Sequence, residues 1–250
     1  MQGFPRLTSG HALFLDFDGT LVDIAPQPDA VWVEEGVIPA LQTLSTLLQG
    51  ALAIVTGRAL SDIDHYLAPL QLNVASEHGA RIRVVTGDDG TTQNSIQVTA
   101  PAHLETAIQR LKAALQQYPS LLLETKTSGL ALHYRNAPAL EPTCSKLMDE
   151  IANDMPGMEM LRGKCVLELK PMGPSKGRAV QTFMQRPAFA GRTPVFVGDD
   201  VTDESAFMAV QSMGGLGIKV GQQGASVATA RCDSAQDVRA WLQQSASGTS

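Results

Sequence analysis

The chain has 250 residues, and 25 acidic side chains against 19 lysines and arginines give it a formal net charge of −6 at pH 7. This balance argues against nucleic acid as a general partner, and no apolar run approaches the length of a membrane-spanning helix. The three cysteines form no Cys-x-x-Cys pair, so we expect idle thiols in a reducing compartment. Without a signal-type segment, the protein is expected to be a cytoplasmic monomer with no membrane partner.

The first third of the chain alternates between short apolar strands and helices. Leucine and isoleucine at helical spacing between Val37 and Leu48 indicate a crossover helix, and Ser61 is predicted to cap the next helix. The expected elements are strands at 12–15, 51–55 and 73–76 and helices at 37–48 and 61–67.

The pattern changes after residue 81. The expected elements there are strands at 81–85, 95–98, 121–124, 130–134, 158–161 and 166–169, with helices at 101–118 and 140–153. The first two strands are predicted to form a hairpin around the turn-rich residues 87–90. The two helices and the strand pairs that accompany them indicate an α+β layer inserted between elements of the core.

Alternation returns towards the C-terminus, with helices expected at 176–185, 202–210 and 235–243 and strands at 195–197 and 217–220. The predicted fold class is therefore α/β: a Rossmann-like parallel-sheet hydrolase core with an inserted α+β cap. We place the core at residues 1–98 and 170–250 and the cap at residues 99–169.

Three of the apolar strands end abruptly in polar residues. The first ends in Asp16-Phe17-Asp18-Gly19-Thr20, the second in Thr56-Gly57-Arg58, and a later one in Gly198-Asp199-Asp200. Strands of this kind lie inside parallel sheets, and ligands bind beyond the carboxyl ends of such strands. The sequence therefore predicts an active site at one edge of the sheet.

Five carboxylates are expected to converge at this edge: Asp16, Asp18, Asp199, Asp200 and Asp203. Asp16 and Asp18 are two residues apart, so both side chains point the same way while the backbone is extended. Carboxylates crowded together repel one another unless a cation lies among them, and an all-oxygen ligand set suits Mg²⁺ better than zinc. An Asp-x-Asp pair alone is equally compatible with a solvated turn.

A carboxylate is ionised at neutral pH and can form an acyl phosphate, so Asp16 is the predicted nucleophile. Asp18 is then placed to protonate the leaving oxygen and later to deprotonate water. Lys176 follows Ser175, a good helix N-cap, and a lysine in a first helical turn is usually only solvated. If the ammonium of Lys176 reached both phosphate and Asp16, their negative charges would offset the unfavourable position of a cation at a helix N-terminus. Charge neutralisation of this kind dominates phosphoryl transfer.

The segment Thr56-Gly57-Arg58 offers a hydroxyl, an approachable backbone N–H and a guanidinium to a phosphate group. In isolation these three residues are more typical of an ordinary turn. Their position directly after the second buried strand favours phosphate binding.

These residues, in this order, resemble the four motifs of the haloacid dehalogenase superfamily: Asp16 to Thr20, Thr56, Lys176, and Gly198-Asp199-Asp200 with Asp203. The resemblance implies that Asp16, the backbone carbonyl of Asp18 and Asp199 hold Mg²⁺, with Asp200 and Asp203 behind these ligands. It also implies a cap between the second and third motifs, as in the branch that acts on sugar phosphates.

Within that superfamily the chain is similar to the bacterial trehalose-6-phosphate phosphatases. The similar segments are 77–79, 123–126, 131–135, 163–171, 195–200 and 202–204. The resemblance implies that Glu124, Lys126 and Glu168 of the cap bind the sugar hydroxyls, with Glu77 and His78 as further substrate-binding residues. His133 and Arg135 are secondary candidates. Without the resemblance, charged residues at strand ends would be read as solvated and Glu77-His78 as a turn.

The resemblance therefore implies a Mg²⁺-dependent phosphatase that converts trehalose 6-phosphate to trehalose and phosphate. The alternatives are a phosphatase for sucrose phosphate or mannosylglycerate phosphate and a hexose phosphomutase. A non-catalytic sugar-phosphate sensor is a further alternative, although a binder has no need of Asp18 beside Asp16.

Overall fold

The computed structural model describes residues 4–25, 27, 29–86, 92–98, 101 and 103–248. It contains two compact units, one formed by residues 1–96 with 174–250 and the other by residues 97–173. The first boundary falls two residues before the one expected from the sequence, and the second falls four residues after its own expected position. The second boundary is later than expected because strand β9 (Val166–Pro171) extends beyond residue 169. It remains paired with β8 (Met158–Gly163) up to its last residue, where Pro171 lies opposite Met158.

The first unit is built on an eight-stranded sheet in the order β12-β11-β10-β1-β2-β3-β4-β5. Its strands are β1 (His11–Leu15), β2 (Leu52–Val55), β3 (Asn73–Ser76), β4 (Arg81–Val85), β5 (Thr92–Gln97), β10 (Thr193–Gly198), β11 (Leu216–Val220) and β12 (Ala230–Cys232). The strands from β12 to β3 run parallel, and β4 is antiparallel to β3. The predicted α/β core is confirmed, with β1 between β10 and β2.

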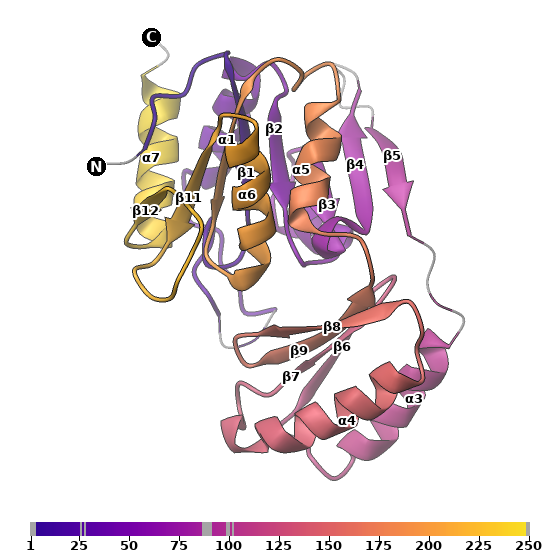
Figure 1. The fold of residues 1–250 in the computed structure, drawn as a ribbon. Coiled ribbons are helices and arrows are strands. Elements are labelled where there is room, and N and C mark those ends of the chain that lie inside the picture. Colours follow the sequence, from indigo (N-terminus) through magenta and orange to yellow (C-terminus); the bar gives the residue numbers. More distant parts are fainter. Residues whose placement is uncertain are drawn as a thin grey trace. The chain divides into compact units, whose positions relative to one another are not determined.

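Helices cover both faces of this sheet. They are α1 (Val37–Leu47), α2 (Leu60–Tyr66), α5 (Lys176–Met184), α6 (Glu204–Ser212) and α7 (Ala235–Ser247). Figure 1 shows α5 and α6 side by side on the near face, with α1 behind the sheet. Strands β2 and β3 are buried along their whole length, as is β1 from Ala12 to Leu15, and the ring centroid of Phe14 on β1 lies 5.5 Å from that of Phe189. Burial of this kind is the main stabilising contribution to the unit.

Two predicted details differ in this unit, and a third lies partly outside the described residues. Helix α2 begins one residue before Ser61, and its N-cap is Ala59, which makes no side-chain cap; the predicted Ser61 cap is wrong because Ser61 lies inside the first turn. Strand β12 was not predicted, since three residues are too few to show a period. Strands β4 and β5 are neighbours as expected, while the predicted turn at 87–90 lies outside the described residues.

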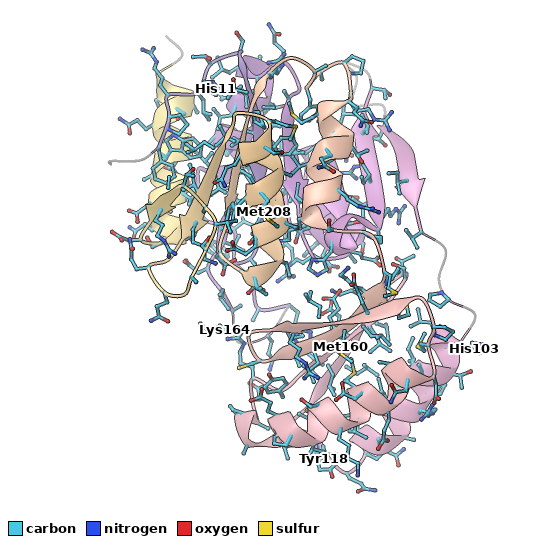
Figure 2. The ribbon with its side chains drawn as sticks, viewed as in Figure 1. His11, His103, Tyr118, Met160, Lys164 and Met208 are labelled. Carbon is cyan, nitrogen blue, oxygen red and sulfur yellow. The ribbon has the colours of Figure 1, made fainter. Side chains whose placement is uncertain are left out.

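The second unit is an antiparallel sheet, in the order β6-β7-β9-β8, with two helices. Its further elements are β6 (Leu122–Thr125), β7 (Leu130–His133), α3 (Leu104–Leu115) and α4 (Glu141–Asn153). Both helices lie along one face of the sheet, and Figure 2 labels Met160 on β8 and Lys164 in the turn that follows it. Leu111, Met148 and Leu132 are among the residues of a separate hydrophobic core. This is the α+β cap.

Across the described part of the chain, no helix has the length and apolar character needed to cross a membrane.

Candidate active site

Asp16 lies directly beyond β1, and its backbone N–H donates to the carbonyl of Val197 on β10 at 3.0 Å. This hydrogen bond keeps the ends of the two strands level. The next residues turn sharply: the carbonyl of Phe17 accepts from the N–H of Leu21 at 2.9 Å, and Gly19 adopts φ +73°. Glycine suits this left-handed conformation, which side chains rarely adopt.

Lys176 brings the first and last motifs together. Its ammonium lies 2.7 Å from Oδ1 of Asp16 and 2.7 Å from Oδ1 of Asp203. Ser175 caps α5 by accepting a hydrogen bond from the N–H of Arg178, as predicted, so the helix begins at Lys176. Lys176 is 3% exposed and Asp203 is fully buried, so this is an interior ion cluster.

The pKa values of this cluster follow from burial and charge. Burial, then the charge of Asp203, raises the pKa of Asp16 well above its usual value, although Lys176 opposes the shift. Burial alone would lower the pKa of Lys176, but the charges of Asp16 and Asp203 outweigh it and raise this pKa. The lysine is therefore held as a cation between two acidic groups.

Asp199 completes a possible metal centre at the end of β10. One carboxylate oxygen from each of Asp16, Asp199 and Asp203 lies within 4.8 Å of the others. A Cβ on Gly19 would lie 2.2 Å from Oδ2 of Asp199, so only glycine leaves room for this carboxylate. Burial, then Asp203, raises the pKa of Asp199 to about 7. Burial and then mutual repulsion raise the pKa values of Asp16 and Asp199, and such a group of carboxylates fits a hard divalent cation.

Asp200 and Asp203 also shape the turn that follows β10. Asp200 accepts from the N–H of Val201 at 2.7 Å, and Oδ2 of Asp203 accepts from the N–H of Asp200 at 2.9 Å. This reciprocal capping box opens the short 3₁₀ turn Val201–Asp203. The turn thus fixes the carboxylate that holds Lys176.

Thr56, at the end of β2, is buried, and its Oγ1 accepts from the N–H of Arg58 at 3.2 Å. The guanidinium of Arg58 makes two parallel hydrogen bonds to Asp18: Nε to Oδ2 at 2.7 Å and Nη2 to Oδ1 at 2.7 Å. The second motif is thereby joined to the first through the side chain of Asp18.

Glu77 and His78 are buried beside the Thr56–Arg58 turn. Their backbone N–H groups donate to the carbonyls of Arg58 at 3.0 Å and of Thr56 at 2.9 Å. Both residues adopt left-handed φ, +49° and +56°, which costs free energy in residues other than glycine. A Cβ on Gly57 would lie 2.6 Å from Nε2 of His78, so the imidazole packs on the bare backbone of Gly57.

A second polar cluster lies within the cap. In the sheet register Ala131 on β7 pairs with Glu124 on one side and Glu168 on the other, so both carboxylates share one face with a small residue between them. Lys126 lies 2.7 Å from Oε1 of Glu168, with side chains 5% and 8% exposed. His133 Nε2 lies 2.7 Å from Oε2 of Glu124.

The charge of Glu124 is stabilised by its neighbours. Burial raises its pKa, but the hydrogen bond from His133 and the charge of Lys126 outweigh burial and place the pKa below its usual value. Arg135, the other secondary candidate, donates to the carbonyl of Lys164 at 3.1 Å. The cap therefore carries a network of acidic and basic side chains, with Lys126 and Glu168 buried and Glu124 and His133 partly buried.

A family model described as "Trehalose-phosphatase" matches residues 14–238, which include both clusters. The chain belongs to the trehalose-phosphatase family. It is 41% identical over 244 residues to the trehalose-6-phosphate phosphatase of Escherichia coli (strain K12), with 96% of this chain and 88% of that protein covered. The chain is accordingly a trehalose-phosphatase, a phosphoric monoester hydrolase of trehalose biosynthesis, as the sequence predicted.

Solved structures agree on the fold. A trehalose-6-phosphate phosphatase related protein has a TM-score of 0.77 at 26% identity, with 94% of this chain and 96% of that chain covered. A phosphatase of the haloalkanoate (HAD) enzyme superfamily from Bacteroides thetaiotaomicron has a TM-score of 0.58 at 18% identity, with 95% of each covered. The haloacid dehalogenase-like fold of this trehalose-phosphatase is thereby confirmed.

Some residues of the site were not predicted from the sequence. Lys219 on β11 donates from Nζ to the backbone carbonyl of Asp199, and the register places it opposite Gly198. A single lysine in the apolar strand 216–220 was the available signal. Tyr66 also contributes, because its ring lies 5.2 Å from the guanidinium carbon of Arg58; nothing in the sequence links Tyr66 to that arginine.

Proposed function

We propose that this trehalose-phosphatase hydrolyses trehalose 6-phosphate through an aspartyl phosphate on Asp16. The observation that carries the proposal is Lys176, whose ammonium lies 2.7 Å from Asp16 and 2.7 Å from Asp203. A buried ammonium beside a nucleophilic carboxylate attracts a phosphoryl group and neutralises charge during its transfer.

Mg²⁺ is the cation that fits this cluster best. The carboxylates of Asp16 and Asp199 and the backbone carbonyl of Asp18 would hold it, with Asp200 and Asp203 behind them. When bound, the ion would neutralise phosphate oxygens and favour the ionised forms of the surrounding aspartates. Asp203 then keeps Lys176 oriented towards Asp16.

In the first step, an Oδ atom of Asp16 forms a bond to phosphorus as the bond to the sugar oxygen breaks. Asp18 gives its proton to the departing oxygen. In the second step Asp18 removes a proton from water, the water oxygen attacks phosphorus, and the bond to Asp16 breaks. Thr56 and the N–H of Gly57 are proposed to contact the phosphate, and the buried Glu77-His78 turn, proposed as part of the substrate site, supports them.

The sugar is proposed to bind Glu124, Lys126 and Glu168. Trehalose is uncharged and rich in hydroxyl groups, so carboxylates that accept and an ammonium that donates suit it. The three free thiols, Cys144, Cys165 and Cys232, accord with a cytoplasmic location, which we also propose.

Release of inorganic phosphate from a panel of sugar phosphates tests the proposal. The wild type is expected to hydrolyse trehalose 6-phosphate ahead of sucrose and mannosylglycerate phosphates, and EDTA should abolish release until Mg²⁺ is restored. Asp16→Asn should keep the wild-type circular dichroism spectrum and lose at least about 10³-fold in kcat. Substantial activity in this variant would reject the covalent mechanism, and exchange of phosphate among hexoses without net release would indicate a mutase.

A further inference from the structure

Arg58 is held in a way that simple phosphate binding does not require. Its guanidinium presents the two nitrogens Nε and Nη2 to the two oxygens of Asp18, each at 2.7 Å. This fork-to-fork arrangement fixes the plane and direction of the carboxylate, which a single contact would leave free to rotate.

Two aromatic rings hold the other side of this arginine. The guanidinium carbon lies 5.4 Å from the ring centroid of Phe17 and 5.2 Å from that of Tyr66. The two rings themselves stack at 5.8 Å. Cation–π contacts at such distances stabilise the guanidinium and restrict its movement.

The backbone of Arg58 is fixed as well. Its N–H donates to Oγ1 of Thr56 at 3.2 Å, and its carbonyl accepts from the N–H of Glu77 at 3.0 Å. The side chain of Arg58 is 10% exposed, while that of Asp18 is 39% exposed. A largely buried arginine, held at both its backbone and its side chain, therefore supports a more exposed carboxylate.

We propose that Arg58 is a positioning residue that acts through Asp18: it sets the orientation of the Asp18 side chain, which protonates the leaving oxygen as the carboxylic acid and takes up the proton of water as the carboxylate. The inference rests on the proposed function. It assigns to Arg58 a role in departure of the sugar, where the sequence suggested a direct contact with phosphate. The ring of Tyr66 is part of the same device.

Substrates with different leaving groups distinguish a role of Arg58 in proton donation from a role in phosphate binding. The alkoxide of trehalose needs a proton as the P–O bond breaks, whereas 4-nitrophenolate and 2,4-dinitrophenolate are stable anions that depart without one. Since kcat/KM covers the steps up to departure of the leaving group, it excludes the later hydrolysis of the aspartyl phosphate. A residue that acts through Asp18 must therefore affect kcat/KM for the sugar phosphate more strongly than kcat/KM for the nitrophenyl phosphates.

The experiment compares Arg58→Ala, Arg58→Lys, Tyr66→Leu and Asp18→Asn, with Arg6→Ala as an exposed control. For trehalose 6-phosphate we expect Arg58→Ala to lower kcat/KM by about 10²-fold or more. The loss on 2,4-dinitrophenyl phosphate should be at least about tenfold smaller. Arg58→Lys should behave similarly because lysine keeps the charge but lacks the fork, and Tyr66→Leu should show a weaker form of the same pattern.

Combining Arg58→Ala with Asp18→Asn provides the second readout. If Arg58 acts through Asp18, the double variant should lose little more than Asp18→Asn alone. Equal losses on both esters, a raised inhibition constant for inorganic phosphate, or independent effects in the double variant would overturn the inference and return Arg58 to phosphate binding. Loss of all activity in Asp16→Asn tests the proposed function separately. Any other alkyl phosphate that the wild type cleaves can replace trehalose 6-phosphate in the Arg58 comparison.

Discussion

At the scale of single residues, Asp199 shows how the acidic cluster links pH, metal and stability. Its pKa rises from 3.8 to about 7 in the folded chain without metal, chiefly because of burial and then Asp203. The folded state therefore binds a proton that the unfolded state has released over this range. The free energy of unfolding should accordingly fall as pH rises from about 4 to about 7.

Asp199→Asn removes this titration. In the absence of divalent ions, the variant should match the wild type near pH 4 and exceed its free energy of unfolding at pH 8 by on the order of 1–3 kcal/mol. Urea unfolding in EDTA at the two pH values measures the difference. Mg²⁺ at pH 8 should stabilise the wild type and leave the variant almost unchanged. A difference that stays constant between pH 4 and pH 8 would contradict the assignment.

At the scale of elements, the position of Lys176 depends on the close approach of α5 to α6. Gly177 donates its N–H to Oγ of Ser205 at 3.1 Å, and a Cβ at Gly177 would lie 2.4 Å from the backbone carbonyl oxygen of Ser205. No side-chain rotation relieves a contact with backbone. The glycine therefore allows the two helices to meet beside Lys176.

Gly177→Ala tests this packing. Alanine favours a helix over glycine by about 1 kcal/mol, but separating the helices should cost about 1–3 kcal/mol. The cost of separating the helices should exceed the gain in helix propensity, so the melting temperature should fall. The value of kcat should also fall, because Lys176 moves with α5. Gly10→Ala is the control, since a Cβ there would meet Thr8 at an ordinary 3.6 Å. An increase in melting temperature with unchanged kcat would show that α5 does not need the close contact.

The elements also show what the sequence could predict. Asp16, Lys176 and Asp199 were predicted to meet because apolar strands and a capped helix bring them to one sheet edge, and local patterns report both features. The pairing of Arg58 with Asp18 lies beyond such patterns, since it depends on the direction of two side chains 40 residues apart. Tyr66 was not predicted for the same reason, since its role arises from packing against the Arg58 side chain.

At the scale of the whole molecule, the two units have separate hydrophobic cores, and each contains one of the two polar clusters described above. The first unit supplies Asp16, Lys176 and Asp199, which are suited to phosphate chemistry on any ester. The cap supplies Glu124, Lys126 and Glu168, which are suited to hydroxyl groups. Changing the second cluster should therefore alter the choice of substrate without altering the chemistry.

Glu124→Gln is the mildest change that tests this division, because the amide keeps the shape and can still bond His133, which lies 2.7 Å away. We expect kcat/KM for trehalose 6-phosphate to fall by about 10- to 1,000-fold, since the variant loses the ionised group proposed to accept hydrogen bonds from the sugar hydroxyls. Hydrolysis of 4-nitrophenyl phosphate, which has no sugar, should change by less than about twofold.

Glu150→Gln on the exposed surface of α4 is the matched control. Amide hydrogen exchange should leave residues 4–25, 29–86 and 174–248 as protected as in the wild type. Equal losses on both esters with unchanged exchange would show that Glu124 serves the phosphoryl chemistry itself and would contradict the proposed role of the cap in selecting the sugar.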